Sequence, residues 1–251
     1  MAEPLLSLRG LVKRFGGLLA TDDVRLDLRA GELHALIGPN GAGKTTLLAQ
    51  IAGNLAPDAG AIVFEGRDIV ALGQHQRVAA GIARSHQITS LFARLSVLDN
   101  LALAVQARSG SSLSFWRPLA AERALFDQAR MLAARIGLGG REGLRADALS
   151  HGEQRALEVG LALATRPRLL LLDEPMAGLG PEETARMIAL IERLRAGITV
   201  LLVEHDMDAV FRLAGRISVL VNGRVIASGA PEAIRADGEV KRAYLGDELA
   251  T

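Results

Sequence analysis

Residues 38–46 read Gly38-Pro39-Asn40-Gly41-Ala42-Gly43-Lys44-Thr45-Thr46, a complete phosphate-binding P-loop, and the chain contains only one. An apolar run, residues 33–37, precedes the loop, and a helix-forming run, residues 47–52, follows it. Glycine lets successive backbone N–H groups turn toward one phosphate, and the next helix directs its positive end to the same point. The sequence therefore predicts a strand, a loop and a helix that bind a nucleoside triphosphate. We expect Lys44 to contact the β- and γ-phosphates and Thr45 to ligate Mg²⁺.

The composition is that of a globular protein with a sizeable core, because 49% of the 251 residues are hydrophobic and 23% are charged. A net charge of +1 and scattered basic residues give no electrostatic reason to expect nucleic acid as a partner. No apolar run approaches the roughly 18 residues of a spanning helix, and residues 1–4 lack the features of a secretion signal. The absence of cysteine excludes disulfides and thiolate metal sites. We expect a cytosolic protein whose positive mean hydropathy suits docking on an apolar partner.

Hydrophobic periodicity divides the chain into parts. Residues 6–12 and 24–28 alternate as strands of an antiparallel layer, which residues 61–66 continue. Helical periodicity then appears between about residues 97 and 164, notably over residues 99–107 and 119–136. These patterns predict a β layer near the N-terminus and a helical segment in the middle of the chain.

Strands and helices alternate again in the last part of the chain. The predicted elements are strands at 169–172, 198–203 and 217–221, helices starting near Pro181 and Met207, and a hairpin at Asn222-Gly223. We therefore predict an α/β fold with a P-loop parallel-sheet core, an N-terminal antiparallel β layer and an inserted α-helical lobe. The core and β layer would comprise residues 1–87 and 166–251, and the lobe residues 88–165.

Two carboxylates follow the apolar run at residues 169–172. An uninterrupted apolar strand suits a sheet covered on both faces, and ligands of such a sheet bind beyond the carboxyl ends of its strands. We expect Asp173 to hold the Mg²⁺ shell and Glu174 to act as the general base toward the attacking water. The alternative is that both acids merely begin a surface turn before Pro175.

Two more polar residues suit the same edge of the sheet. Gln87 follows a short apolar run at the border of the lobe and could contact Mg²⁺ and the attacking water. His205 follows the strand at 198–203 and could bind the γ-phosphate or position the water. Each could equally be structural, because a lone histidine or glutamine carries no specific signal.

The segment Leu149-Ser150-His151-Gly152-Glu153-Gln154 has capping-box spacing between Ser150 and Glu153. It predicts a helix from Ser150 to Ala164, whose N-terminus is a second anion-binding end. An ordinary capped helix is the alternative interpretation. We call residues 149–154 the signature segment.

The motifs of this chain resemble, in their order, those of an ABC-type ATPase, over essentially the whole chain. They are the P-loop, Gln87, the signature segment, Asp173-Glu174 and His205. The resemblance implies a RecA-like core, ATP as ligand and ATP hydrolysis as activity. It assigns Phe15 to adenine stacking, Gln87 to the Q-loop, Glu174 to the catalytic carboxylate and His205 to the switch histidine. A P-loop kinase outside this family would leave the signature segment unexplained.

The resemblance also implies that the nucleotide is shared between subunits. ATP would lie between the P-loop of one subunit and Ser150, Gly152 and Glu153 of another, so two sites form when two subunits meet head to tail. The second subunit could be another copy of this chain or a related ATPase.

Within this family, the chain is most similar to the ATPases of branched-chain amino-acid importers, on the strings at 14–18, 203–207 and 242–246. This likeness implies a peripheral subunit on the cytoplasmic face of the cell membrane. It would bind transmembrane permease subunits and serve an extracytoplasmic solute-binding protein indirectly. Residues 88–100 would line the groove for the permease, where Leu91 and Phe92 are either exposed for docking or part of the lobe core.

Other family functions stay open at this point. An ATPase for another cargo, such as a lipid or lipopolysaccharide exporter, shares many of these strings. A soluble ABC protein acting on ribosomes or DNA is disfavoured, because such proteins usually carry paired ATPase domains, long coiled-coil insertions or basic arms. The chain departs from the family by Gly180, where Asp or Asn is usual, and by His151 in the signature segment.

Overall fold

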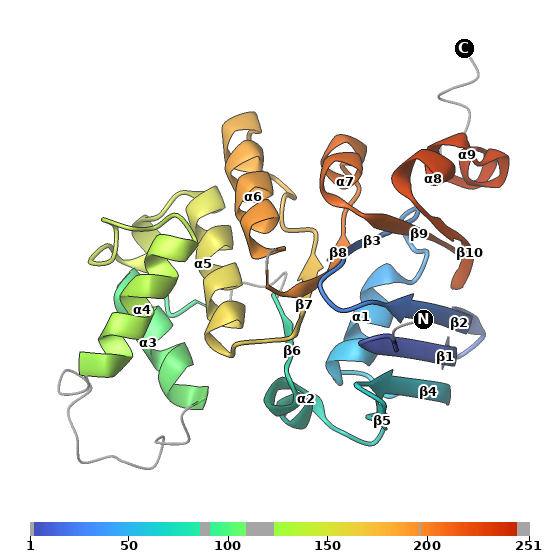
Figure 1. The fold of residues 1–251 in the computed structure, drawn as a ribbon, viewed down its shortest axis with the longest axis horizontal. Helices are drawn as coiled ribbons and strands as arrows, with labels where there is room; N and C mark the ends of the chain where they lie inside the picture. The colour runs from blue at the N-terminus through green and yellow to red at the C-terminus, as the bar shows by residue number, and fades with distance from the viewer. Residues whose placement is uncertain (1–2, 86–90, 109–122, 196, 245–251) are drawn as a thin grey trace.

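The computed structural model describes residues 3–85, 91–108, 123–195 and 197–244. Within these ranges a six-stranded sheet with the order β10-β9-β3-β8-β7-β6 forms the centre, with helices on both faces (Figure 1). The strands are β3 (Leu33–Ile37), β6 (Ile82–Arg84), β7 (Leu169–Asp173), β8 (Thr199–Val203), β9 (Arg216–Val221) and β10 (Arg224–Gly229). Only the β9–β10 pair is antiparallel among these neighbours. The predicted parallel-sheet core is confirmed.

The central strands are apolar throughout because both faces of the sheet are covered. In β7, Leu170 and Leu172 belong to one buried cluster, while Leu169 and Leu171 belong to another on the opposite face. Asp173 follows the alternation of Leu169 and Leu171, so its side chain lies on their face. Helix α1 (Lys44–Ala52) packs its leucines into that same cluster.

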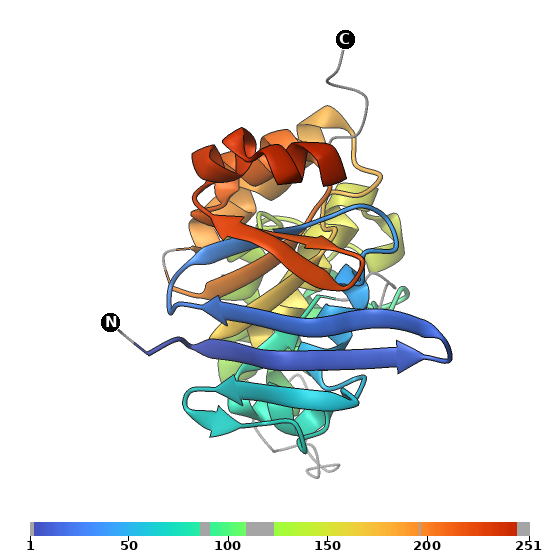
Figure 2. The ribbon, with the colours of Figure 1, turned by 90° about the vertical axis from the view of Figure 1, so that its right-hand side faces the viewer.

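A second, four-stranded antiparallel sheet lies over α1 and runs in the order β2-β1-β4-β5 (Figure 2). Its strands are β1 (Leu6–Phe15), β2 (Leu18–Leu28), β4 (Ala59–Phe64) and β5 (Arg67–Asp68). Strand β2 begins six residues before the predicted Val24. The register between β1 and β2 shifts near Asp23, whose φ is 50°, and this bulge interrupts the alternation from which the strand was predicted.

The helical lobe consists of α3 (Val97–Arg108), α4 (Arg123–Arg135) and α5 (His151–Ala164). Helix α5 has Ser150 as its N-cap and carries the predicted capping box. A Cβ atom at Gly160 would lie 2.7 Å from Ile136 and 3.0 Å from Leu101, so glycine permits the close packing of α5 at this point. The helical expectation for residues 97–107 and 150–164 is confirmed, while residues 119–122 lie outside the described residues.

The remaining helices are α2 (Gln74–Ala80), α6 (Pro181–Leu194), α7 (Met207–Leu213), α8 (Pro231–Ala236), α9 (Gly238–Tyr244) and the 3₁₀ turn η3 (Ala146–Ala148). Gly180 is the N-cap of α6 and Pro181 its first residue, so the departure at Gly180 leaves the helix start intact. The predicted hairpin at Asn222-Gly223 joins β9 to β10, with φ of 47° and 78°.

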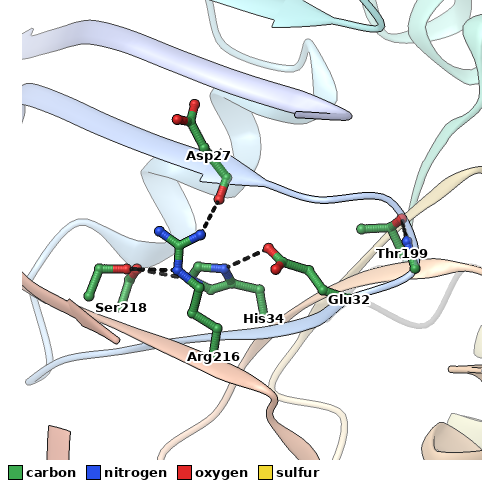
Figure 3. A network of polar contacts seen from close by, with 8 residues as sticks. Asp27, Glu32, His34, Thr199, Arg216 and Ser218 are labelled. Atoms are coloured by element: carbon green, nitrogen blue, oxygen red, sulfur yellow. Dashed lines mark hydrogen bonds and ion pairs between the residues drawn. The ribbon is translucent and has the colours of Figure 1, made fainter. Parts of the chain in front are cut away.

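A buried polar network ties β3 to β9 near the first residues of β3 (Figure 3). The His34 ring is fully buried, with Nδ1 3.1 Å from Glu32 Oε1 and Nε2 2.8 Å from Ser218 Oγ. Burial favours a raised pKa for Glu32, but the hydrogen bonds to its carboxylate, above all that of His34, outweigh burial and leave this pKa below its ordinary value. The network therefore fixes β3 at the end opposite the P-loop.

Candidate functional site

The P-loop leaves the carboxyl end of β3 and enters α1 in a conformation that requires glycine. Gly43 has a φ of 102°, and a Cβ there would lie 2.1 Å from the carbonyl oxygen of Ala20 in β2. The N–H of Gly223 donates to the carbonyl of Ala42 at 2.9 Å. The β2 strand and the β9–β10 hairpin therefore hold the loop from two sides.

Lys44 folds back over this loop. Its Nζ donates to the carbonyl oxygens of Gly38 at 2.6 Å and Pro39 at 3.0 Å, and the side chain is buried. Burial lowers the pKa of the ammonium, and the negative charges of Glu174 and Asp173 oppose this effect. The three residues thus share one electrostatic environment. Thr45, next in α1, is exposed.

Asp173 has one carboxylate oxygen engaged and one without a partner. Its Oδ2 accepts a hydrogen bond from Arg84 Nη2 at 2.7 Å, while the buried Oδ1 has no hydrogen-bond partner in the described structure. Among the described residues there is no cluster of three His, Cys, Asp or Glu side chains able to hold a metal. Mg²⁺ does not need one, because it binds one or two carboxylates, waters and substrate phosphates. The orphaned Oδ1 and the Thr45 hydroxyl are therefore suitable ligands for Mg²⁺.

Glu174 occupies a backbone conformation that is unusual for glutamate. Its φ is 48°, and its N–H donates to the carbonyl of Val203 at 2.9 Å. Behind it, the buried Glu204 accepts hydrogen bonds from the N–H groups of Met176 at 2.9 Å and His205 at 3.2 Å. Burial raises the pKa of Glu204. This carboxyl thus joins the loops that follow β7 and β8, which carry Glu174 and His205.

The other predicted residues of this site are less constrained. The His205 side chain is 60% exposed, with Nδ1 3.9 Å from Glu204 Oε2. Phe15, at the end of β1, is 50% exposed, and Lys13 Nζ lies 5.8 Å from the centre of its ring. Both side chains are accessible to a ligand. Gln87 lies outside the described residues.

The signature segment lies on the other face of the sheet. The leucines of α5 belong to the cluster that α6 and α7 share, whereas α1 packs on the opposite cluster. Glu153 Oε2 accepts from the Ser150 N–H at 3.0 Å, and Glu153 also pairs with Arg141 at 3.0 Å. The hydroxyl of Ser150 and the N–H of Gly152 both donate to Glu183, at 2.7 and 3.1 Å.

Arg84, Glu204 and Glu183 contact predicted site residues but were not themselves predicted from the sequence. In the sequence, Arg84 ends an apolar strand three positions before Gln87, and Glu204 follows an apolar strand directly before His205. A polar residue at the end of an apolar strand was therefore a signal that could have identified both. Glu183 lies in the first turn of α6, where an acidic residue is ordinary, so no sequence signal distinguished it.

These features define an ATP-binding cassette. A family model described as "ABC transporter" matches residues 21–177, more than half of the chain, so the chain belongs to this family and is an ATPase. The structure agrees: a cassette of an ABC transporter solved in its ADP conformation superposes with a TM-score of 0.86 at 29% identity, covering 98% of this chain and 100% of that one.

The similarity extends to one group within the family. A model described as "Branched-chain amino acid ATP-binding cassette transporter" matches residues 224–250. The high-affinity branched-chain amino acid transport ATP-binding protein LivG of Salmonella typhimurium is 41% identical, covering 98% of this chain and 100% of LivG. The corresponding protein BraF of Pseudomonas aeruginosa is 38% identical over the same shares. None of the described helices is both long and apolar enough to cross a membrane.

Proposed function

We propose that this chain is the ATP-hydrolysing subunit of an importer for branched-chain amino acids or related small solutes. The observation that carries the proposal is similarity to LivG and BraF over nearly the whole chain, together with the second family match at residues 224–250. The meeting of Lys44, Asp173 and Glu174 at one edge of the sheet supports ATP hydrolysis as the energy source.

In this proposal, residues at the carboxyl edge of the central sheet bind the phosphates of ATP and position the attacking water. The P-loop N–H groups and Lys44 bind the β- and γ-phosphates, Phe15 stacks on adenine, and Glu174 accepts a proton from the attacking water. Gln87 and His205 orient the water and the γ-phosphate. Thr45, Gln87 and Asp173 would hold Mg²⁺, which neutralises charge that develops on the phosphates.

A second subunit would complete each site. Helices α1 and α5 pack on opposite faces of the sheet, which favours a signature segment that serves the nucleotide of another subunit. ATP would close the dimer because it contacts both subunits only in the closed state. Hydrolysis would then remove the phosphate that joins them and reopen the dimer.

Closure would move transmembrane permease subunits docked on the cytoplasmic side. Phe92, 58% exposed, is available for such docking, while Leu91 is partly buried against the core. Asn100 fixes the backbone at Phe92. Its Oδ1 accepts a hydrogen bond from the Phe92 N–H at 2.9 Å, and its Nδ2 donates to the Phe92 carbonyl at 3.1 Å. An extracytoplasmic solute-binding protein would deliver cargo to the permease and act on this subunit only indirectly.

The role of Glu174 is tested by Glu174→Gln, with Glu182→Gln as a control at an exposed acid of α6. We expect Glu174→Gln to keep ATP affinity and lose about 10²–10⁴-fold in turnover, the contribution of a general base. Phosphate release at saturating ATP measures turnover. Near-normal hydrolysis would exclude the role.

Shared sites are tested by mixing Ser150→Ala with Lys44→Ala, each expected to be inactive alone. In a mixed dimer one of the two sites has both parts intact, so the mixture should regain partial activity. If each subunit completed its own site, mixing would restore nothing at any ratio.

The cargo is tested with the subunit and its permease in proteoliposomes. We expect ATP hydrolysis to rise when the solute-binding protein is added with leucine. A rise caused by lipopolysaccharide and not by the loaded binding protein would identify an exporter instead.

A further inference from the structure

The hydrogen-bond donors of the signature segment already bind a carboxylate side chain of the same subunit. The Ser150 hydroxyl and the Gly152 N–H converge on a single atom, Glu183 Oε1, at 2.7 and 3.1 Å. These donors also lower the pKa of Glu183 below its ordinary value, because they stabilise the charged carboxylate. Under the proposed function, these are the donors that the γ-phosphate of the other subunit's ATP requires.

The contact is close and specific. A Cβ atom at Gly152 would lie within 2.9 Å of the Glu183 side chain, so only glycine lets the carboxylate reach the end of α5. The capping box does not need it, because Glu153 and Ser150 already satisfy each other. Glu183 is therefore an additional acceptor on this helix end.

The Glu183 carboxylate also has an alternative charged neighbour, Arg186. The contact lies in a cavity of about 340 Å³, whose lining includes Arg186 and Arg193 of α6. Arg186 is three residues further along the helix, the spacing at which side chains meet, and its charge contributes to the lowered pKa of Glu183. The carboxylate can thus leave the Ser150 hydroxyl and still be neutralised by the guanidinium of Arg186.

We propose that Glu183 is an autoinhibitory contact that opposes ATP-driven closure, an inference that rests on the proposed function. In the free subunit its carboxylate occupies the donors of Ser150 and Gly152. A nucleotide closes the dimer only if its γ-phosphate displaces that carboxylate, and ADP carries no such group. Glu183 therefore raises the ATP concentration needed for closure.

The test compares Glu183→Gln with Glu182→Gln, each combined with Glu174→Gln to prevent turnover. Light scattering measures the dimer fraction against ATP concentration, with ADP, which carries no γ-phosphate, as the negative control. We expect Glu183→Gln to lower the half-saturating ATP concentration by about tenfold, the effect of removing a competing charge-assisted contact. Glu182→Gln changes the same charge one residue away and should leave the value within about twofold.

Equal half-saturating concentrations for the two variants would overturn the inference and leave the shared site intact. Failure of the Glu174→Gln parent to associate would instead count against a nucleotide shared between two copies of the chain. A second measurement needs only the monomer: the carboxyl of Glu183, followed by NMR, should titrate below 4.5 and return toward that value in Ser150→Ala. An ordinary value in the unaltered chain would overturn the inference, since the contact would not form in solution.

Discussion

The buried pair of Arg84 and Asp173 supports the most quantitative prediction, which concerns Arg84→Met. The two side chains are 11% and 1% exposed, and their atoms are 2.7 Å apart. Methionine keeps most of the apolar stem of Arg84 but removes the donor. Asp173 would then be a buried carboxylate without a protein partner on either oxygen, because Oδ1 has none in the described structure.

Removing one member of a buried ion pair costs about 3–5 kcal/mol. For a chain of this size, each kcal/mol shifts the melting temperature by about 2–4 °C. We therefore expect Arg84→Met to melt at least about 6 °C below the unaltered protein. The control is Arg130→Met, which breaks an exposed pair with Asp127 of nearly the same length, 2.8 Å. It should cost less than about 1 kcal/mol.

The assays are thermal melting and urea unfolding, both followed by circular dichroism, and they are completed as a double-mutant cycle with Asp173→Asn. In the double variant neither charge is left unpaired, so its loss should be about 2–3 kcal/mol smaller than the sum of the single losses. The reasoning is refuted if Arg84→Met costs no more than Arg130→Met, or if the two losses simply add. Either result would mean that Asp173 is solvated without Arg84.

Two further predictions concern the P-loop and the signature segment. Gly43→Ala combines a φ of 102° with a Cβ 2.1 Å from a carbonyl oxygen, so we expect a loss of at least about 2 kcal/mol in unfolding free energy and no ATP binding. Gly17→Ala, with no atom within 4 Å of the added Cβ, is its control in urea unfolding and nucleotide titration. The pKa of Glu183 is lowered from 4.5, so its contacts should stabilise the fold above pH 4.5 and lose this effect as the pH falls through the lower folded value. The difference in unfolding free energy between the protein and Glu183→Gln should accordingly shrink below about pH 4.5; a difference independent of pH would contradict the assignment.

Much of the fold could be predicted because its signals are local. The capping box at Ser150, the Asn222-Gly223 turn and the apolar run of β7 each depend on residues within a few positions of one another, and each was found where the sequence placed it. Strand β2 was predicted too short, because the bulge near Asp23 reverses the alternation of its first half. The sequence pattern carries no information about such a register shift.

The sequence by itself determined the candidate groups for binding and hydrolysing a nucleotide, because each is a chemical requirement that a short stretch meets alone. A glycine-rich loop and Lys44 are predicted to bind phosphate, and two carboxylates after a buried strand are predicted to serve Mg²⁺ and the attacking water. Only the tertiary structure decided what those residues contact. Asp173 is bound to a residue 89 positions away, and Ser150 to one 33 positions away. The sheet order and the packing of α6 against α5 bring these groups together, and a buried or converging polar group must take whichever partner the fold places beside it.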